Sequence, residues 1–183
     1  GGGGGGGGTG SHNDRYYMRG VAVEEFGDRS KMQLMRVPRP VFFPQNEPTM
    51  VLVRVHAVAL NHHDARVRNG DHKHWLHAEF PLVLAADFSG VVVEAGRNVR
   101  KVAVGDSVFG RMRDNHYGAL TDYIMVDELA VSRKPTTLSH TQAASLPTSA
   151  LTAVQALRAA RVTNTTKVYV SGGGGGVGGD GGG

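Results

Sequence analysis

The sequence contains no cysteine among its 183 residues. This absence excludes disulfide bonds and thiolate ligands for a metal, and it suits the cytoplasm, which is the location we expect. Long apolar runs are also missing, because no stretch approaches the roughly 20 residues that cross a bilayer. We also expect no signal peptide before the first domain. We therefore expect no membrane partner.

Neither sign of charge dominates the chain. The formal net charge is +4, and lysine and arginine alternate with aspartate and glutamate instead of forming a basic run. This pattern does not favour nucleic-acid binding, so we expect no nucleic-acid partner. Hydrophobic residues make up 40% of the chain, which is enough for one good core or two small ones.

Glycine is abundant, but most of the 27 glycines lie at the two ends. Residues 1–8 are all glycine and 9–12 read as the scar of an expression tag, so we expect a tag-like leader over 1–17 and a biological start at Met18. The tail 179–183 stands where a helix is expected, and glycine costs about 1 kcal/mol per helical position relative to alanine. We expect truncation or placeholder residues there.

Between the ends the pattern is mostly that of short β-strands. Alternating or β-branched runs bounded by Gly, Pro and Asp turns predict strands over 20–25, 50–60, 88–94, 107–110 and 120–126. Many short strands of this kind predict an antiparallel barrel or sandwich.

The periodicity changes after Pro135. Residues 139–146 and 149–160 predict helices, the second capped by Thr148 or Ser149 and burying one face. That face consists of Leu151, Val154 and Leu157. An apolar strand over 167–171 then runs into a glycine turn, as at the opening of a parallel α/β sheet. We expect a domain boundary within 138–152, and the whole is of mixed α/β class.

The glycine turn is a candidate nucleotide site. Glycines let backbone N–H groups approach a pyrophosphate, while the next helix directs its positive end at the phosphates. The expected cofactor contacts are Gly172, Gly173, Gly175, Gly176, Val177 and Gly178. A run of glycines fits almost any glycine pattern, so a flexible tail is the alternative.

These segments together resemble the medium-chain dehydrogenase/reductase superfamily, and within it the zinc-independent quinone oxidoreductase branch that includes zeta-crystallin. The matching segments are VLVRV at 51–55, NHHD at 61–64, DFSGVVVE at 87–94, VGDSVFG at 104–110, GALTDY at 118–123, AASLP at 143–147 and LTA at 151–153. The resemblance implies a GroES-like β-barrel catalytic domain over 18–138. It also implies linker helices and the first strand and glycine turn of a truncated Rossmann domain over 139–183.

The resemblance also implies the chemistry. Zinc-dependent members place cysteine where Asn61 stands and histidine where Ala86 stands, so we expect no zinc here. The implied activity is hydride transfer from NADPH to a small-molecule substrate, either a quinone or an α,β-unsaturated carbonyl, in a protein that forms a homodimer when full-length. The alternative is a GroES-like binding module, or an inactive fragment that holds no cofactor of its own.

Two residues carry implied roles in this reading. The Asn61 amide is expected to face the nicotinamide or the substrate oxygen as the catalytic residue, and Thr152 is expected to contact the cofactor. The alternatives are a turn asparagine bonded to its own backbone and an ordinary threonine of a first helical turn. Asp64 is expected to hold the turn after Asn61 or to pair with a nearby arginine, and Tyr123 to be a half-buried sheet aromatic.

Five histidines fall within sixteen residues, namely His62, His63, His72, His74 and His77. Imidazole is the commonest metal ligand, but no carboxylate or cysteine recurs with these histidines at a ligand spacing, so we assign no metal site. A separate departure is Ala85, where relatives usually have glycine. If the backbone there requires positive φ, alanine strains the turn by about 1 kcal/mol or more.

Overall fold

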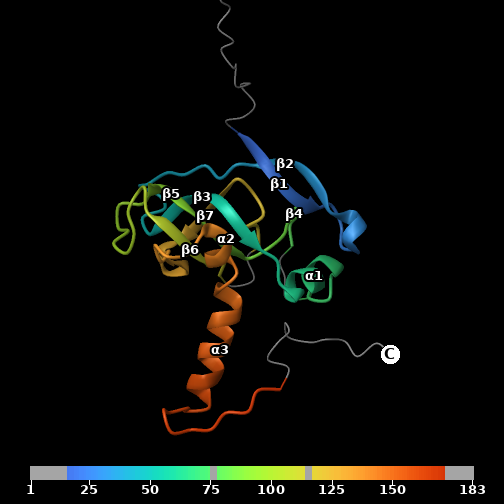
Figure 1. The fold of residues 1–183 in the computed structure, drawn as a ribbon. Helices are drawn as coiled ribbons and strands as arrows, with labels where there is room; N and C mark the ends of the chain where they lie inside the picture. The colour runs from blue at the N-terminus through green and yellow to red at the C-terminus, as the bar shows by residue number, and fades with distance from the viewer. Residues whose placement is uncertain (1–15, 75–77, 114–116, 172–183) are drawn as a thin grey trace, which may run out of the picture.

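The computed structural model describes residues 16–74, 78–113 and 117–171. Its strands are β1 (Tyr17–Val23), β2 (Gln33–Pro38), β3 (Met50–Ala59), β4 (Leu82–Val83), β5 (Asp87–Ala95), β6 (Ser107–Arg111), β7 (Tyr123–Asp127) and β8 (Val131–Arg133). Its α-helices are α1 (His62–Asn69), α2 (His140–Ala144) and α3 (Pro147–Ala159), with short 3-10 turns at Arg29–Lys31 and Glu128–Ala130. Figure 1 shows the strands gathered above α3.

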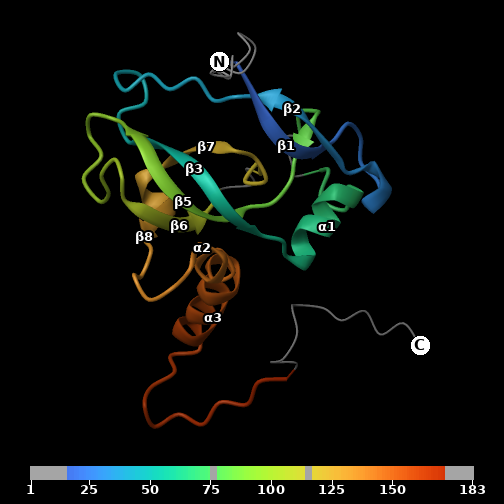
Figure 2. The same ribbon diagram turned by 45° about the horizontal axis from the view of Figure 1, so that its top comes forward.

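The strands form two antiparallel sheets. One has the order β2-β1-β4 and the other β7-β3-β5-β6-β8. A bridge between Gly20 and Thr121 joins them, so together they curve into the partly open barrel of Figure 2. The expected antiparallel barrel is confirmed. Because β1 begins at Tyr17, the last residue of the predicted leader 1–17 belongs to a sheet.

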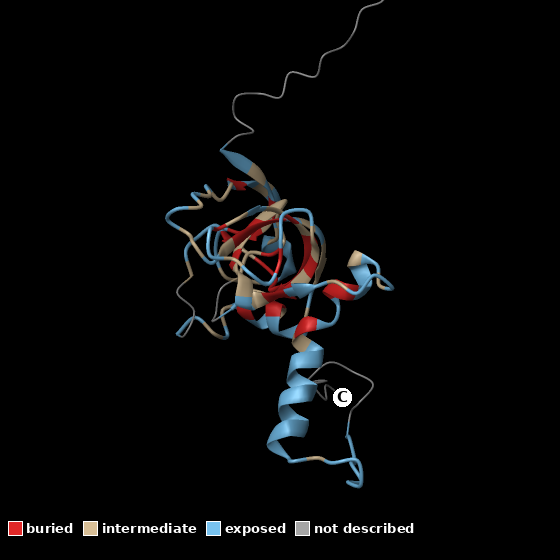
Figure 3. Ribbon diagram, turned by 90° about the vertical axis from the view of Figure 1, so that its left-hand side faces the viewer, coloured by how far each residue is buried: buried red, intermediate tan, exposed pale blue. Residues whose placement is uncertain are grey.

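The core lies inside the five-stranded sheet. Phe88, Val51, Val53, Val92 and Val108 are fully buried or nearly so, and they come from the alternating inward positions of β3, β5 and β6. Each such side chain contributes about 1.5–3 kcal/mol when it leaves water. The buried class in Figure 3 is concentrated in this barrel.

One glycine allows β3 and β5 to lie this close. A Cβ added at Gly90 would lie 2.1 Å from the backbone oxygen of Arg54 on β3. No flexible side chain can move to relieve that contact, because the neighbour is backbone. The close approach brings the end of β3 against the start of β5, where the candidate site lies.

The helices α2 and α3 follow the barrel in very different surroundings. In α2, Ala143 and Ala144 are buried against the barrel, and Ser139 and Gln142 form a capping box at its start. In contrast, α3 projects away from the barrel and is largely exposed (Figure 3). Its first residue is Pro147, a favoured position for proline, so the prediction of Thr148 or Ser149 as the cap is wrong.

Two further expectations for this end of the chain are wrong. The side chains of Leu151, Val154 and Leu157 are 51%, 42% and 43% exposed instead of forming a buried face. Residues 167–171 form no strand, and Tyr169 within them is 91% exposed. Both have one physical reason: a strand needs hydrogen-bonded neighbours and an apolar helical face needs a sheet to cover it, and the described residues supply neither.

Candidate functional site

The candidate site is built around Asp87, the first residue of β5. Asp87 pairs with Ala59, the last residue of β3, on one side and with Arg111, the last residue of β6, on the other. Both neighbouring strands therefore reach their ends beside this carboxylate. Asp87 is fully buried, yet both of its oxygens accept hydrogen bonds. A buried carboxylate needs such donors, because burying it unpaired would cost several kcal/mol.

Three hydrogen bonds converge on Asp87. Its Oδ2 accepts from Asn61 Nδ2 at 3.1 Å and from the backbone N–H of Thr148 at 3.0 Å, and its Oδ1 accepts from Thr148 Oγ1 at 2.7 Å. The hydroxyl of Thr148 in turn accepts from Arg111 Nε at 3.1 Å. The carboxylate of a sheet strand thus satisfies an orphan N–H group in the first turn of α3, a task that the helix's own N-cap side chain usually performs.

The same bonds connect the two residues that the sequence singled out. Asn61 reaches Asp87 directly, and the Thr152 hydroxyl donates to the carbonyl oxygen of Thr148 at 2.7 Å. A continuous path of hydrogen bonds therefore runs from Asn61 through Asp87 and Thr148 to Thr152. The structure brings these residues into one network, while the roles expected for Asn61 and Thr152 stay predictions.

Asn61 is also the N-cap residue of α1. Its backbone N–H donates to Asp64 Oδ2 at 2.6 Å, so Asp64 holds the turn, as the sequence predicted. Burial raises the pKa of Asp64, and the hydrogen bonds from Asn61 oppose that rise. The nearby arginines have other partners: Arg66 pairs with Asp71, and Arg68 donates to the carbonyl of Gly27.

The residues just before Asp87 bear on the question of zinc. Ala86 is buried and offers only a methyl group, and the Asn61 amide is committed to Asp87. In zinc-dependent enzymes, these two positions supply a thiolate and an imidazole. An amide nitrogen and a methyl group do not bind zinc, so these residues do not fit a catalytic zinc ion.

Ala85 adopts a left-handed backbone conformation, with φ of 68°. The condition under which we expected strain at this position, a positive φ, is therefore met. Its carbonyl oxygen accepts hydrogen bonds from the backbone N–H groups of Gly118 and Ala119, both at 3.0 Å, which hold the turn in place.

A second group of titratable side chains lies around α1 and was missed as a group from the sequence. The rings of His63 and His72 lie 4.7 Å apart, and the ring of Tyr117 lies 6.2 Å from that of His63. Burial is the main cause that lowers the pKa of His63, followed by the charge of His72. Burial and Asp64 raise the pKa of Tyr117 to about 12. Within 16–74, 78–113 and 117–171, no three potential ligands gather as they would around a metal ion.

A third polar group lies on the same strand as Asp87. Ser89 is fully buried, its hydroxyl donates to the carbonyl of Val108 at 2.8 Å, and it lies 2.7 Å from His140 Nδ1. The ring of His140 stacks on His56 at 4.6 Å. Since the single Ser89 proton goes to Val108, the Nδ1 atom of His140 carries a proton and donates to Ser89. No local pattern points to this pair, because its members are far apart along the chain.

Among the expected cofactor contacts, Thr152 is the one that lies within the described residues. Thr152 is exposed on α3, and its oxygen has room to accept a further hydrogen bond, so it fits a contact with a polar cofactor group. Gly172, Gly173, Gly175, Gly176, Val177 and Gly178 lie outside the described residues.

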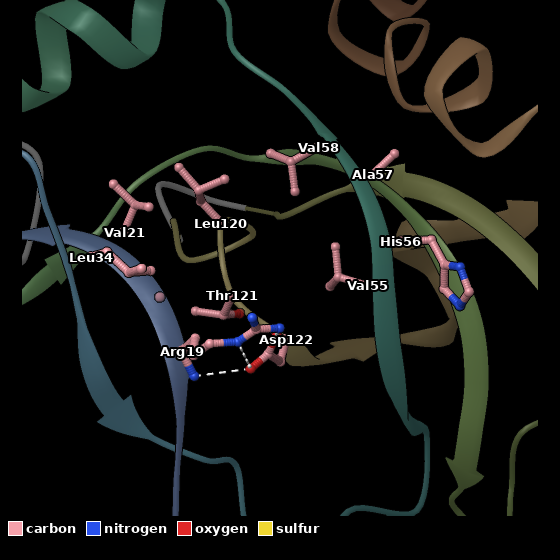
Figure 4. A pocket seen from close by; sticks show the side chains of 11 residues that line it. Arg19, Val21, Leu34, Val55, His56, Ala57, Val58, Leu120, Thr121 and Asp122 are labelled. Atoms are coloured by element: carbon pink, nitrogen blue, oxygen red, sulfur yellow. Dashed lines mark hydrogen bonds and ion pairs between the residues drawn. The ribbon is translucent and has the colours of Figure 1, made fainter.

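A separate hollow of about 330 Å³ lies between the sheets. Figure 4 shows Arg19 and Asp122 paired at one end of it, and Arg19 Nη2 lies 2.9 Å from Asp122 Oδ1. Its other walls are mostly aliphatic, from Val21, Val55 and their neighbours. Neither Asn61 nor Thr152 lines this hollow, so it is distinct from the candidate site.

The barrel, the polar network at the strand ends and the helix that leaves it define a GroES-like catalytic domain of the alcohol dehydrogenase type. Residues 47–136 match the family model for the alcohol dehydrogenase GroES-like domain. The chain belongs to the medium-chain dehydrogenase/reductase superfamily, as its resemblance indicated.

Individual relatives support this membership. The chain is 35% identical over 148 residues to the bovine mitochondrial NAD(P)H oxidoreductase RTN4IP1, covering 74% of this chain and 37% of the relative. It is 30% identical over 138 residues to the chloroplastic NADPH-dependent alkenal/one oxidoreductase of Arabidopsis thaliana, covering 72% and 36%. Among solved structures, the quinone oxidoreductase from Coxiella burnetii has a TM-score of 0.72 and 35% identity, covering 80% of this chain and 46% of that one.

These relatives establish two facts about the chain. It spans less than half the length of the relatives it matches. The expected cytoplasmic location is contradicted, because the bovine, mouse and human relatives are mitochondrial and the Arabidopsis one is chloroplastic. A lack of cysteine is therefore a poor guide to compartment here.

None of the helices in the described part of the chain combines the length and the apolar character needed to cross a bilayer.

Proposed function

We propose that the full-length protein, meaning this chain with any further segment encoded with it, transfers a hydride from NADPH to a quinone or an α,β-unsaturated carbonyl without zinc. An oxidoreductase activity is supported by the relatives, which are NAD(P)H and quinone oxidoreductases. The names of the Arabidopsis and Coxiella relatives support the substrate class and the preference for NADPH. The organelles in the names of the bovine and Arabidopsis relatives favour a location inside an organelle.

The observation that carries the proposal is the bond between Asn61 and Asp87. At the position where zinc enzymes use a metal ligand, this chain holds a neutral amide that donates a hydrogen bond to a buried carboxylate. Such an arrangement positions a hydrogen-bonding group and provides no Lewis acid.

Hydrogen bonding alone suits an acceptor that is already electrophilic. When hydride adds to a conjugated carbonyl, its electron pair ends as negative charge spread over the conjugated system, and a proton then completes the reduced product. Reduced nicotinamide supplies the hydride when it is bound. The part assigned to Asn61 is to orient the nicotinamide or the substrate oxygen, and Arg111 adds positive charge nearby.

The residues proposed to hold the cofactor are Thr152 and the glycine turn at 172–178. We also propose that the full-length protein is a homodimer, to be measured by analytical ultracentrifugation. An activity confined to the longer protein is compatible with the described residues, because the predicted first Rossmann strand over 167–171 has no neighbouring strands. On that observation, the chain by itself acts as an incomplete enzyme.

The test compares this chain with the full-length protein. NADPH is titrated against each while nicotinamide fluorescence is followed, and NADPH oxidation is then assayed with a quinone and an enone. We expect binding and turnover by the full-length protein alone, with turnover retained after treatment with a zinc chelator. Loss of turnover on chelation would contradict the metal-free mechanism, and no NADPH binding by either protein would favour a binding module.

A further inference from the structure

The bonds to Asp87 assign a task to a residue that takes no part in the proposed hydride transfer itself. We propose that Asp87 is the positioning residue for Asn61, fixing the orientation of its side-chain amide and tying that orientation to the start of α3. This inference rests on the proposed function, because it gives Asn61 its use. Asp87 is buried, accepts three hydrogen bonds, and begins β5 between the ends of β3 and β6.

The Asn61 side-chain amide can point in either of two ways. An asparagine side chain can be flipped so that its oxygen and nitrogen exchange places, and only its partners decide between the two. Against Asp87 Oδ2, at 3.1 Å, the nitrogen donates a hydrogen bond, whereas the amide oxygen would repel the carboxylate. Asp87 therefore selects one of the two orientations, and the capping box, in which the Asn61 side chain accepts from the backbone N–H of Asp64, is compatible with the same orientation.

Asp87 is itself held by hydrogen bonds. Its Oδ1 is bonded to the Thr148 hydroxyl and its Oδ2 also to the Thr148 N–H, so the carboxylate has one fixed position. Thr148 lies in the first turn of α3, and Thr152 follows one turn later with its hydroxyl on the Thr148 carbonyl. A displacement of α3 would therefore move the carboxylate that orients Asn61. The substrate side and the cofactor side of the site share this one group.

Asp87 could also have a different role. A role only in folding is the main alternative, since breaking up buried hydrogen bonds destabilises any protein. Ser89 provides the matched control. It lies on the same strand two residues later, is equally buried, and bonds to Val108 and His140 with no bond to Asn61. A variant at Ser89 loses buried hydrogen bonds without disturbing the Asn61 amide.

The experiment measures kcat and KM of the full-length protein for N61A, D87A, the double variant N61A/D87A, D87N and S89A. A misplaced catalytic group costs about 100-fold in rate, so N61A and D87A should each lower kcat by about 10- to 100-fold. The double variant should fall within about twofold of the worse single variant, because Asp87 acts through Asn61. D87N keeps an acceptor oxygen for Asn61, so its loss of kcat should be under about fivefold. S89A should lower the urea midpoint while kcat stays within about twofold.

A second measurement does not depend on activity. In ¹⁵N NMR spectra of the 183-residue chain, the Asn61 side-chain amide signals should shift in D87N, where the bond loses its charge, and stay in place in S89A. Unchanged Asn61 signals in D87N would overturn the positioning role, even where D87A does not fold. The positioning role would also be overturned if the fold-losses of kcat in N61A and D87A multiplied in the double variant, because the two residues would then act independently. If the full-length wild-type protein did not oxidise NADPH but the Asn61 signals still shifted in D87N, the proposed function would be refuted and the positioning role would stand.

Discussion

Ala85 holds a left-handed backbone conformation that alanine rarely adopts, and its cost is measurable. With φ of 68°, its Cβ crowds the following carbonyl, which costs about 1–2 kcal/mol for a residue other than glycine. Ala85→Gly removes that strain. The same change also removes a buried methyl group, worth about 0.8 kcal/mol, and makes the unfolded chain more flexible, at about 0.5–1 kcal/mol.

These opposing contributions nearly cancel, so A85G should change the free energy of unfolding by less than about 1 kcal/mol in either direction. The neighbouring Ala86 is the control, because it is also buried but has no positive φ. A86G loses the methyl group and gains chain flexibility with no strain to release, so it should be destabilised by about 1.5 kcal/mol.

The assay is urea unfolding of both variants, followed by circular dichroism. The difference between the variants, about 1–2 kcal/mol in favour of A85G, is the strain energy. On heating, it corresponds to roughly 2–8 °C in Tm for a chain of this size. Equal destabilisation by A85G and A86G would refute the reasoning, because it would mean that the turn at Ala85 stores no strain.

Two further predictions concern the helices. The pKa of His140 is lowered by burial, by His56 and by Lys134. As the pH falls below about 6.5, the unfolded chain therefore takes up a proton before the fold does. The stability that neutral His140 contributes is full above about pH 6.5 and is lost as the pH falls through the folded pKa of His140. The H140Q variant should therefore show a flatter dependence of the urea midpoint on pH. A dependence equal to that of the wild type would contradict this prediction. The second prediction is a triple replacement by glutamine of the three exposed apolar residues of α3. This variant should show less self-association of the 183-residue chain, as measured by light scattering. Its free energy of unfolding should change by less than about 0.5 kcal/mol. A loss above 2 kcal/mol would mean that this face is packed in solution. The three residues are Leu151, Val154 and Leu157.

The central strands were predictable from the sequence because their signal is local. The runs at 50–60, 88–94 and 107–110 alternate or are rich in β-branched residues, and β3, β5 and β6 formed there within a residue or two. The strand predicted over 120–126 begins only at Tyr123. Residues just before it bond instead to the other sheet, where the carbonyl of Leu120 accepts from the N–H of Val21.

Helix α1 could not be predicted, for a physical reason visible in its residues. Its sequence HHDARVRN has little apolar character and so lacks the helical period. Its ends define it instead: Asp64 accepts from the Asn61 N–H at the start, and Gly70 adopts a left-handed conformation at the end. Strand β4 has only two residues and exists through pairing with β1, which no local pattern encodes.

The candidate site divides in the same way. Asn61 could be singled out, because a motif after a strand places it, but its partner Asp87 comes 26 positions later and meets it only when β3 and β5 pair. A charged residue at the head of a valine-rich strand was the one available signal, since a carboxylate seldom enters a sheet core without donors.

The same comparison explains why the predicted buried face of α3 failed while the predicted barrel succeeded. Every strand of the barrel pairs with another strand within the described residues, and together these strands bury a core. Helix α3 is held at its first turn by Asp87 and Arg111 through Thr148, while its apolar residues stay about half exposed. Its amphipathic sequence carries information about a contact that these residues do not make. The pattern at 149–160 is therefore better explained by a covering layer beyond the described residues than by an error in reading the period, and the full-length protein should protect the α3 amides from hydrogen exchange more strongly than this chain does.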